Sequence, residues 1–461
     1  MSARTIAVFG SHVLAEQDGV QTVLPDRWVL LEAGRIAAVS PARPAADLVL
    51  DAPGRLVLPG LINIHHHSVS EMIARARGEA PGGAGSVAKI VYQVLMPLTL
   101  RAGTLLSKQE RLAIARLGML QLLLGGCTSV MEPFRPVLAE MFEAAEEFGL
   151  RYWGAPYLFS TADPQFRADG SVDYAATTAD DSSRDLAEWN ALHARWQGAG
   201  DGRIAVAMSP HATDTCDPAL LRACLDRARE LGVPFTIHLA QSPDEVVTIR
   251  ARHGCSPAEY LDRAGVLVPG TLAAHCVACS DDDLRLMAAR GVVVLNCPRI
   301  FAREGILAPF ARFERHGLKV CVATDGYGGD LLGDLSMAAM VSRLWAGDAG
   351  AVTAEALLES VTAGAATALG RADLGAIREG AAGDVTVFDL THPQIAPLRD
   401  PRRALLAYSG SARMETLIVA GRPLVSGGRW LGGDEAAVAA AGEAAVRRLW
   451  NLPEVAAALG G

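Results

Sequence analysis

The stretch Pro59-Gly-Leu-Ile-Asn-Ile-His-His-His67 ends a short apolar run directly in three histidines. Side chains along a strand alternate between its two faces, so His65 and His67 are predicted to point to one side and His66 to the other. Two imidazoles on one face, two residues apart, can chelate a single metal ion. An open, doubly wound sheet would instead carry a glycine-rich phosphate turn after its first strand. The stretch therefore favours a metal site at the end of a strand over a nucleotide-binding turn.

The chain around this stretch alternates apolar runs with helical patterns. Eight runs have the length of buried strands, at residues 61–64, 128–131, 152–155, 204–207, 235–237, 272–274, 292–295 and 320–323. Helical patterns lie between them, at residues 108–124, 136–148, 185–197, 218–231, 281–289 and 309–316. Strands that alternate with helices in this way predict an α/β fold, a closed (β/α)₈ TIM-like barrel.

Both ends of the chain have a different pattern. Short apolar runs, separated by glycine and proline, occur before residue 59 and return after residue 383, which is the spacing of β-meanders. We expect a small β-sandwich domain built from both termini, residues 1–58 with 380–430, and a barrel at residues 59–379. The Ala-rich residues 431–461 predict a C-terminal helix.

Composition excludes several classes of protein. The formal charge of −9 argues against nucleic-acid binding, which needs a basic face, so the expected partner is a small molecule. No run of 18 apolar residues predicts a membrane span, and the N-terminus lacks a signal-peptide pattern. The eight cysteines are scattered and most lie in apolar runs, so we interpret them as reduced core thiols of a cytoplasmic protein.

Further metal-binding side chains follow other predicted strands. His238, His275 and Asp325 each come directly after an apolar run, and barrel enzymes place their chemistry at the carboxyl ends of strands. A lone histidine at a strand end is more often structural, but several of them in barrel order favour one shared site. Imidazole nitrogens and a carboxylate oxygen suit Zn²⁺, Fe²⁺ or Mn²⁺. We predict that His65, His67, His238 and Asp325 hold one divalent ion, with His275 beside them.

These motifs resemble those of the amidohydrolase superfamily. Residues 59–67 are similar to its first metal motif, and His238-Leu-Ala, Ala274-His275 and Thr324-Asp325-Gly326 are similar to the later ones. The most similar branch holds triazine hydrolases, guanine deaminase and adenosine-type deaminases. Ser209-Pro-His-Ala-Thr-Asp-Thr-Cys216 resembles a stretch of that branch in which the histidine, here His211, faces the substrate. The resemblance implies zinc as the metal, with iron or manganese as alternatives, and a possible homodimer.

The resemblance also implies a metal count and a chemistry. Binuclear relatives carry a carboxylated lysine at the end of the fourth strand, and residues 203–210 contain no lysine, so one ion is expected. A bound divalent ion lowers the pKa of its water towards about 7 and so supplies hydroxide. Asp325 would then act as ligand and base, and His275 would hold the developing oxyanion or orient the nucleophile. We predict a hydrolase of carbon–nitrogen bonds in small molecules.

One position departs from the deaminase pattern. Deaminases of this branch have a proton-carrying glutamate three residues after the histidine of the fifth strand, where this chain has Gln241. An amide carries no proton at working pH. Asp244, Glu245 or Glu132 could replace it, or His275 and Asp325 suffice. The glutamine shifts the expected substrate towards an amide, urea, carbamate or substituted heterocycle. The alternatives are a deaminase or dechlorinase of a purine- or triazine-like ring, a binuclear phosphotriesterase-like enzyme and a non-catalytic scaffold.

The loops after the strands carry the predicted substrate contacts. We expect substrate-binding roles for His211, Gln241, His275, Arg299 and Tyr327, and Phe301 is a further possible pocket residue. Glu71 and Arg75 lie in the loop after the first metal motif, whose glycine-rich end at residues 78–85 has the composition of either a lid or a flexible connector.

Overall fold

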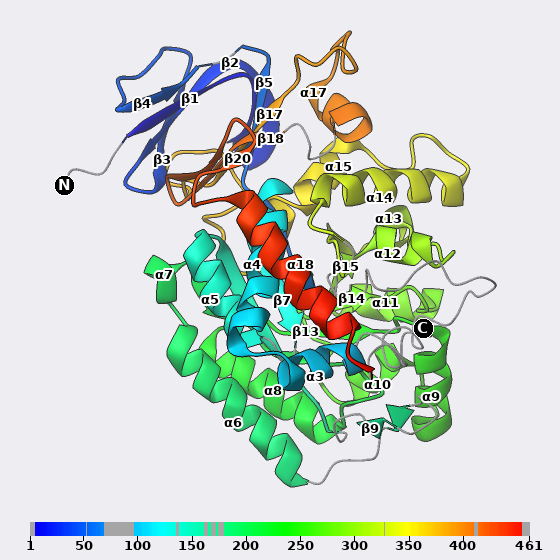
Figure 1. The fold of residues 1–461 in the computed structure, drawn as a ribbon. Coiled ribbons are helices and arrows are strands. Elements are labelled where there is room, and N and C mark those ends of the chain that lie inside the picture. Colours follow the sequence, from blue (N-terminus) through cyan, green and yellow to red (C-terminus); the bar gives the residue numbers. More distant parts are fainter. Residues whose placement is uncertain are drawn as a thin grey trace.

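The computed structural model of the chain describes residues 5–51, 53–68, 96–134, 138–160, 165–166, 172–173, 179–326, 328–409 and 414–453. Figure 1 shows two parts: strands from both ends of the sequence lie together on one side, and the central helices surround the rest. Within these ranges, none of the helices has the length and the apolar composition of a membrane span.

All eight predicted central strands are present, as two parallel sheets. The first sheet consists of β6 (Leu61–Asn63), β7 (Cys127–Phe134), β8 (Arg151–Leu158) and β11 (Ile204–Val206), with the short β12 (Ser209–Pro210) beside β8. The second consists of β13 (Thr236–Leu239), β14 (Leu272–His275), β15 (Val293–Asn296) and β16 (Lys319–Val322). Parallel bridges join the edges of the two sheets, Met208 with Phe235 and His66 with Asp325. The second of these bridges brings the first metal motif beside the last one.

Local signals fix the helices that the sequence predicted best. Helix α4 (Lys108–Leu124) begins at a capping box of Ser107 and Glu110, and α11 (Asp281–Ala289) begins at one of Ser280 and Asp283. Helix α8 (Pro218–Leu231) has Asp217 as N-cap and ends at Gly232 in the left-handed conformation. The bounds of these three helices agree with the prediction. The other helices are α3 (Met96–Leu105), α5 (Leu138–Phe148), α6 (Ala179–Trp196), α7 (Ala199–Gly202), α9 (Pro243–His253), α10 (Pro257–Arg263), α12 (Pro298–Arg303), α13 (Phe310–Arg315), α14 (Leu331–Ala346), α15 (Ala354–Ser360), α16 (Ala363–Ala368), α17 (Pro401–Ala404) and α18 (Glu435–Trp450).

The terminal strands form one continuous sheet of nine strands. Its order is β20-β19-β18-β17-β5-β1-β2-β3, with β4 beside β1. The strands are β1 (Ile6–Gln17), β2 (Val20–Glu32), β3 (Arg35–Ser40), β4 (Leu48–Leu50), β5 (Arg55–Pro59), β17 (Val385–Asp389), β18 (Met414–Val419), β19 (Arg422–Ser426) and β20 (Arg429–Trp430). Both chain ends contribute because β17 pairs antiparallel with β5. Over these residues a single sheet is described, where the sequence predicted the two sheets of a sandwich.

A buried ion pair joins the terminal sheet to the central strands. Arg151 at the start of β8 donates two hydrogen bonds to Asp384, at 2.6 and 3.0 Å, and both side chains are buried. Asp384 also accepts the backbone N–H of Ala420 at 2.8 Å. On the outside, α18 packs along α4, as Figure 1 shows. Helix α18 therefore supports a helix that contacts β7, the second central strand.

Candidate metal centre

His65 and His67 leave β6 towards the same space, as the period of two predicts. His65 is fully buried, and both of its ring nitrogens lack a hydrogen-bond partner among the described residues. The ring of His67 donates from Nδ1 to the Pro133 carbonyl oxygen at 2.7 Å. That bond fixes the tautomer of His67 and leaves Nε2 available as a ligand atom, an arrangement typical of metal-bound histidines.

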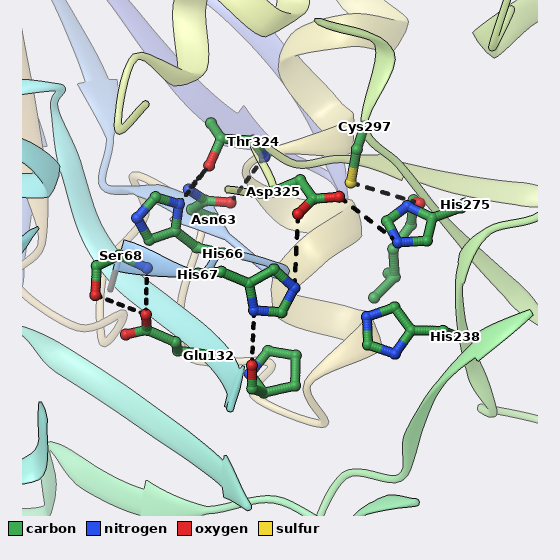
Figure 2. Close-up of polar contacts among 12 residues, drawn as sticks. Asn63, His66, His67, Ser68, Glu132, His238, His275, Cys297, Thr324 and Asp325 are labelled. Atoms are coloured by element: carbon green, nitrogen blue, oxygen red, sulfur yellow. Dashed lines mark hydrogen bonds and ion pairs between the residues drawn. The ribbon is translucent and has the colours of Figure 1, made fainter. Parts of the chain in front are cut away.

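His238 at β13 repeats this arrangement from the opposite sheet. Its Nδ1 donates to the carbonyl oxygen of His211 at 2.8 Å, so Nε2 is the nitrogen left for an ion. The ring centroid of His65 lies 4.7 Å from that of His67 and 5.1 Å from those of His238 and His275. Figure 2 shows the rings of His67, His238 and His275 around a common space.

Asp325 lies between two of the histidines. Its Oδ1 is 3.6 Å from Nε2 of His67, and its Oδ2 is 3.6 Å from Nε2 of His275. His275 and Asp325 both have positive φ angles, 76° and 55°, which side chains other than glycine rarely adopt. Such strain at two strand ends occurs mainly where function requires it. The backbone N–H of Asp325 donates to the carbonyl oxygen of His65 at 3.0 Å, which fixes the two motifs to each other.

The donor atoms fit a metal ion. One ligand atom each from His65, His67 and His238 lie within 4.8 Å of one another, and so do one each from His65, His275, Cys297 and Asp325. All of these side chains are buried. Buried imidazoles grouped around a carboxylate are the donor set that a zinc-like ion requires, and His65 has no hydrogen-bond partner for either ring nitrogen among the described residues. The residues present therefore fit a divalent ion.

Burial sets the protonation states of this group. Desolvation is the largest cause that lowers the pKa values of His65, His67 and His275 well below 6.5, and repulsion from neighbouring imidazoles adds to it. The pKa of His238 falls to about 4 for the same first reason. The imidazoles are therefore neutral at physiological pH, which is the form that binds metals. Desolvation raises the pKa of Asp325 to about 7.

His66 lies on the other side of the strand, as predicted. Its Nδ1 is 2.8 Å from the Thr324 hydroxyl, which also accepts a hydrogen bond from the Asn63 amide at 2.7 Å. Burial lowers the pKa of His66 to about 3. These contacts make His66 a structural link between the first and last central strands.

His211 lies next to the candidate metal centre, together with a tyrosine that the sequence did not indicate. The ring of His211 is 5.1 Å from that of His238, and its Nδ1 is 2.9 Å from the Thr215 hydroxyl. Tyr157 at the end of β8 lies 4.8 Å from the ring of His211, and its hydroxyl is 3.5 Å from Nε2 of His238. The one available signal for Tyr157 was a polar aromatic residue near the end of a predicted strand.

The carboxyl groups considered as replacements for the missing glutamate have other partners. Glu245 is buried; its carboxylate accepts the Gln241 backbone N–H at 2.9 Å and the Thr213 hydroxyl at 2.5 Å. Burial raises the pKa of Glu245 to about 8. Asp244 is exposed. Glu132 accepts the hydroxyl groups of Ser68 and Tyr152, at 2.6 and 3.0 Å. The contacts of Glu245 and Glu132 fix the loops around the histidines.

The remaining predicted substrate contacts are only partly described. Arg299 donates to the Asp330 carbonyl oxygen at 2.9 Å and pairs with Asp334 at 3.3 Å, so these contacts engage its guanidinium with the start of α14. Phe301 lies against His275, with ring centroids 5.1 Å apart. Tyr327, Glu71, Arg75 and residues 78–85 lie outside the described residues.

Known proteins match most of the chain in sequence and in fold. The model of the amidohydrolase family matches residues 56–424. The chain is 34% identical over 406 residues to the 5-methylthioadenosine/S-adenosylhomocysteine deaminase of Natronomonas pharaonis, with 86% of each chain covered. A zinc-bound adenosine deaminase from Xanthomonas campestris has a TM-score of 0.84 at 24% identity, with 97% of this chain and 99% of that chain covered. A zinc complex of the atrazine chlorohydrolase of Arthrobacter aurescens gives a TM-score of 0.85 at 24% identity, with 96% and 100% covered.

Proposed function

Because the chain belongs to the amidohydrolase family, we propose that it is a zinc-dependent hydrolase with one metal ion. It acts on a carbon–nitrogen bond of a small molecule, such as an amide, urea, carbamate or substituted nitrogen heterocycle. The observation that carries this proposal is the group of buried imidazoles with Asp325 at the carboxyl ends of the central strands. The zinc-bound solved structures with the same fold support the choice of metal.

The scaffold for this site is a closed barrel in our proposal. Bridges at both edges between the two parallel sheets support the closure, because they connect β11 towards β13 and β6 towards β16. Barrel enzymes gather catalytic residues from several strands at one end. Residues 1–58 with 380–430 would form the accompanying β domain around the barrel at residues 59–379.

His65, His67, His238 and Asp325 would hold the ion. When bound, the ion supplies Lewis-acid chemistry and makes water a stronger nucleophile at neutral pH. Asp325 accepts the proton of the attacking water on a carboxylate oxygen. His275 contacts Asp325 through Nε2, at 3.6 Å from Oδ2, and so orients that carboxylate.

The other side chains of the site bind the substrate and exclude water. Tyr157 is buried and burial raises its pKa well above 10, so its hydroxyl keeps its proton and donates a hydrogen bond. His211 lies beside it and packs against Phe159 and Tyr157, which form an apolar wall. An aromatic wall next to a few polar groups is suited to a flat, unsaturated substrate.

Gln241 separates this chain from deaminases. Its amide can orient a substrate nitrogen but carries no proton to a leaving ammonia. The proposal therefore favours substrates with a better leaving group. A second candidate function is deamination of a purine-like ring, which the 34% identity to a 5-methylthioadenosine/S-adenosylhomocysteine deaminase supports.

A substrate screen with zinc-loaded enzyme tests the proposal. Amides, ureas, carbamates and amino-heterocycles are offered in parallel, and released ammonia is measured separately from released amine. The proposal expects turnover of a substrate that releases an amine or acid, while ammonia release from a purine would favour the second candidate. No turnover of any of these classes by zinc-loaded enzyme would contradict both.

The variant Gln241→Glu tests the reason for the preference. It should raise deamination of amino-heterocycles by about 10²–10⁴-fold, the usual effect of a positioned acid–base group. Gln241→Met is the matched control, since it has a similar volume and carries no proton. Equal deaminase activity in the two variants would show that another group carries the proton.

A further inference from the structure

The sulfur of Cys297 lies at the metal centre in a position that the proposed function does not use. Cys297 follows β15, is fully buried and occupies the N-cap position of α12. Its side chain makes no capping hydrogen bond to the described residues of that helix. The partner of Sγ is the Leu295 carbonyl oxygen at 4.0 Å, which is a weak contact. No strong hydrogen bond among the described residues therefore holds the thiol away from the histidines.

Cys297 belongs to a second group of metal-binding donors. One ligand atom each from His65, His275, Cys297 and Asp325 lie within 4.8 Å of one another. The Nδ1 of His275, like both ring nitrogens of His65, is buried without a hydrogen-bond partner in the described part of the chain. This second group therefore contains buried nitrogens without hydrogen-bond partners among the described residues, in addition to the thiol.

Asp325 connects the two groups through its two oxygens. Oδ1 faces His67 and Oδ2 faces His275, each at 3.6 Å from Nε2 of the histidine. Figure 2 shows Cys297 and His275 on one side of this carboxylate and His67 on the other. A carboxylate in this orientation can offer one oxygen to each of two neighbouring cations.

We propose that Cys297, His275 and Oδ2 of Asp325 form a second metal position for a thiophilic divalent ion, such as Cd²⁺ or excess Zn²⁺. Thiolate ligands select such soft ions. Binding replaces the S–H bond by a sulfur–metal bond, and the thiol proton leaves to solvent. This inference rests on the proposed function, because the first ion is taken to occupy His65, His67, His238 and Oδ1 of Asp325, which leaves Oδ2 for the second ion. An ion in the second position withdraws His275 and Asp325 from their proposed roles, so it inhibits the enzyme.

Titration of the zinc-loaded enzyme with CdCl₂ tests the inference. Sulfur-to-cadmium charge-transfer absorption in the ultraviolet reports on the thiol, and zinc and cadmium are counted by mass spectrometry after desalting. The wild type should keep its zinc, gain one cadmium and develop the absorption. Cys297→Ser should keep its zinc but lose both the absorption and the additional cadmium. Cys321→Ser is the matched control, because Cys321 is an equally buried thiol on β16 outside the donor group, and it should behave as the wild type.

The outcomes separate this inference from the proposed function. Cys297→Ala replaces the serine variant if the latter does not fold. The second position is contradicted if the zinc-loaded wild type shows no sulfur–cadmium absorption, or if the Cys297 variant keeps it. In either case the bound zinc leaves the proposed function intact. A wild type that binds no zinc would contradict the proposed function, and this inference with it.

Discussion

Replacing Glu132 by glutamine should reduce the loss of unfolding free energy that the protein suffers as the pH rises. Glu132 is a fully buried carboxyl near the end of the second central strand. It fixes the turn after His67 by hydrogen bonding to Ser68. One of its oxygens accepts the Ser68 hydroxyl at 2.6 Å and the other accepts the Tyr152 hydroxyl at 3.0 Å. Burial, opposed by these hydrogen bonds, raises the pKa of Glu132 from 4.5 to about 7.

The magnitude follows from that change in pKa. A rise from 4.5 to about 7 corresponds to about 3 kcal/mol, at about 1.36 kcal/mol per pKa unit. Below pH 4.5 Glu132 is protonated in both the folded and the unfolded state, and its contribution to the unfolding free energy is fully present. As the pH rises towards the folded pKa of about 7, the unfolded chain ionises this carboxyl while the folded protein keeps it protonated, so the unfolding free energy falls. Above the folded pKa the carboxyl is ionised in both states and this contribution is lost. The wild type should therefore lose about 3 kcal/mol of unfolding free energy relative to Glu132→Gln between about pH 4.5 and pH 8.

Urea unfolding of chelator-treated wild type and Glu132→Gln at several pH values measures the difference. Removal of metal from both proteins prevents pH-dependent metal binding from adding to the result. Glu379→Gln is the control, because it makes the same chemical change on an exposed carboxyl. A difference between wild type and Glu132→Gln that stays constant with pH, or that favours the wild type as the pH rises, would refute the reasoning.

Two further substitutions test the site and the fold. Asp325→Asn should lower kcat by about 10²–10⁴-fold, since an amide cannot accept the proton of water; steady-state kinetics with a circular dichroism check would measure it, and unchanged kcat would remove the base assignment. Asp384→Ala leaves the Arg151 guanidinium buried without its two hydrogen bonds of 2.6 and 3.0 Å. Its expected cost is about 3–5 kcal/mol in urea unfolding, and Arg151→Met in the same chain should recover part of it. A loss below about 1 kcal/mol would mean that the terminal sheet is held mainly by other contacts.

Features with local causes could be predicted from the sequence. The helices α4, α8 and α11 have their predicted bounds because capping residues stand at their ends. The positions of His65 and His67 on one side, and of His66 on the other, followed from the period of the strand. Barrel enzymes place their chemistry at strand ends, so His238, His275 and Asp325 could be selected as candidates without knowledge of the contacts that bring them together.

Features that depend on neighbours across the fold could not be predicted. Cys297 was interpreted as a core thiol, and only the approach of β15 to Asp325 brings it to the candidate metal centre. Tyr157 gains its place beside His238 from the packing of β8 against residues far along the chain. Arg299 stays a predicted substrate contact, and its ion pair with Asp334, which the sequence did not indicate, depends on how α14 is oriented. In each case the partner is remote in sequence and carries no local signal.

Metal content tests the central claim most directly. Purified protein is equilibrated with one molar equivalent of ZnCl₂, desalted and analysed for zinc by mass spectrometry, alongside His67→Ala and His66→Gln. The account predicts about one zinc per chain in the wild type and in His66→Gln, whose changed side chain lies on the far side of the strand, and a large loss in His67→Ala. Wild-type protein without zinc, or zinc retained equally when His67 is replaced, would contradict it.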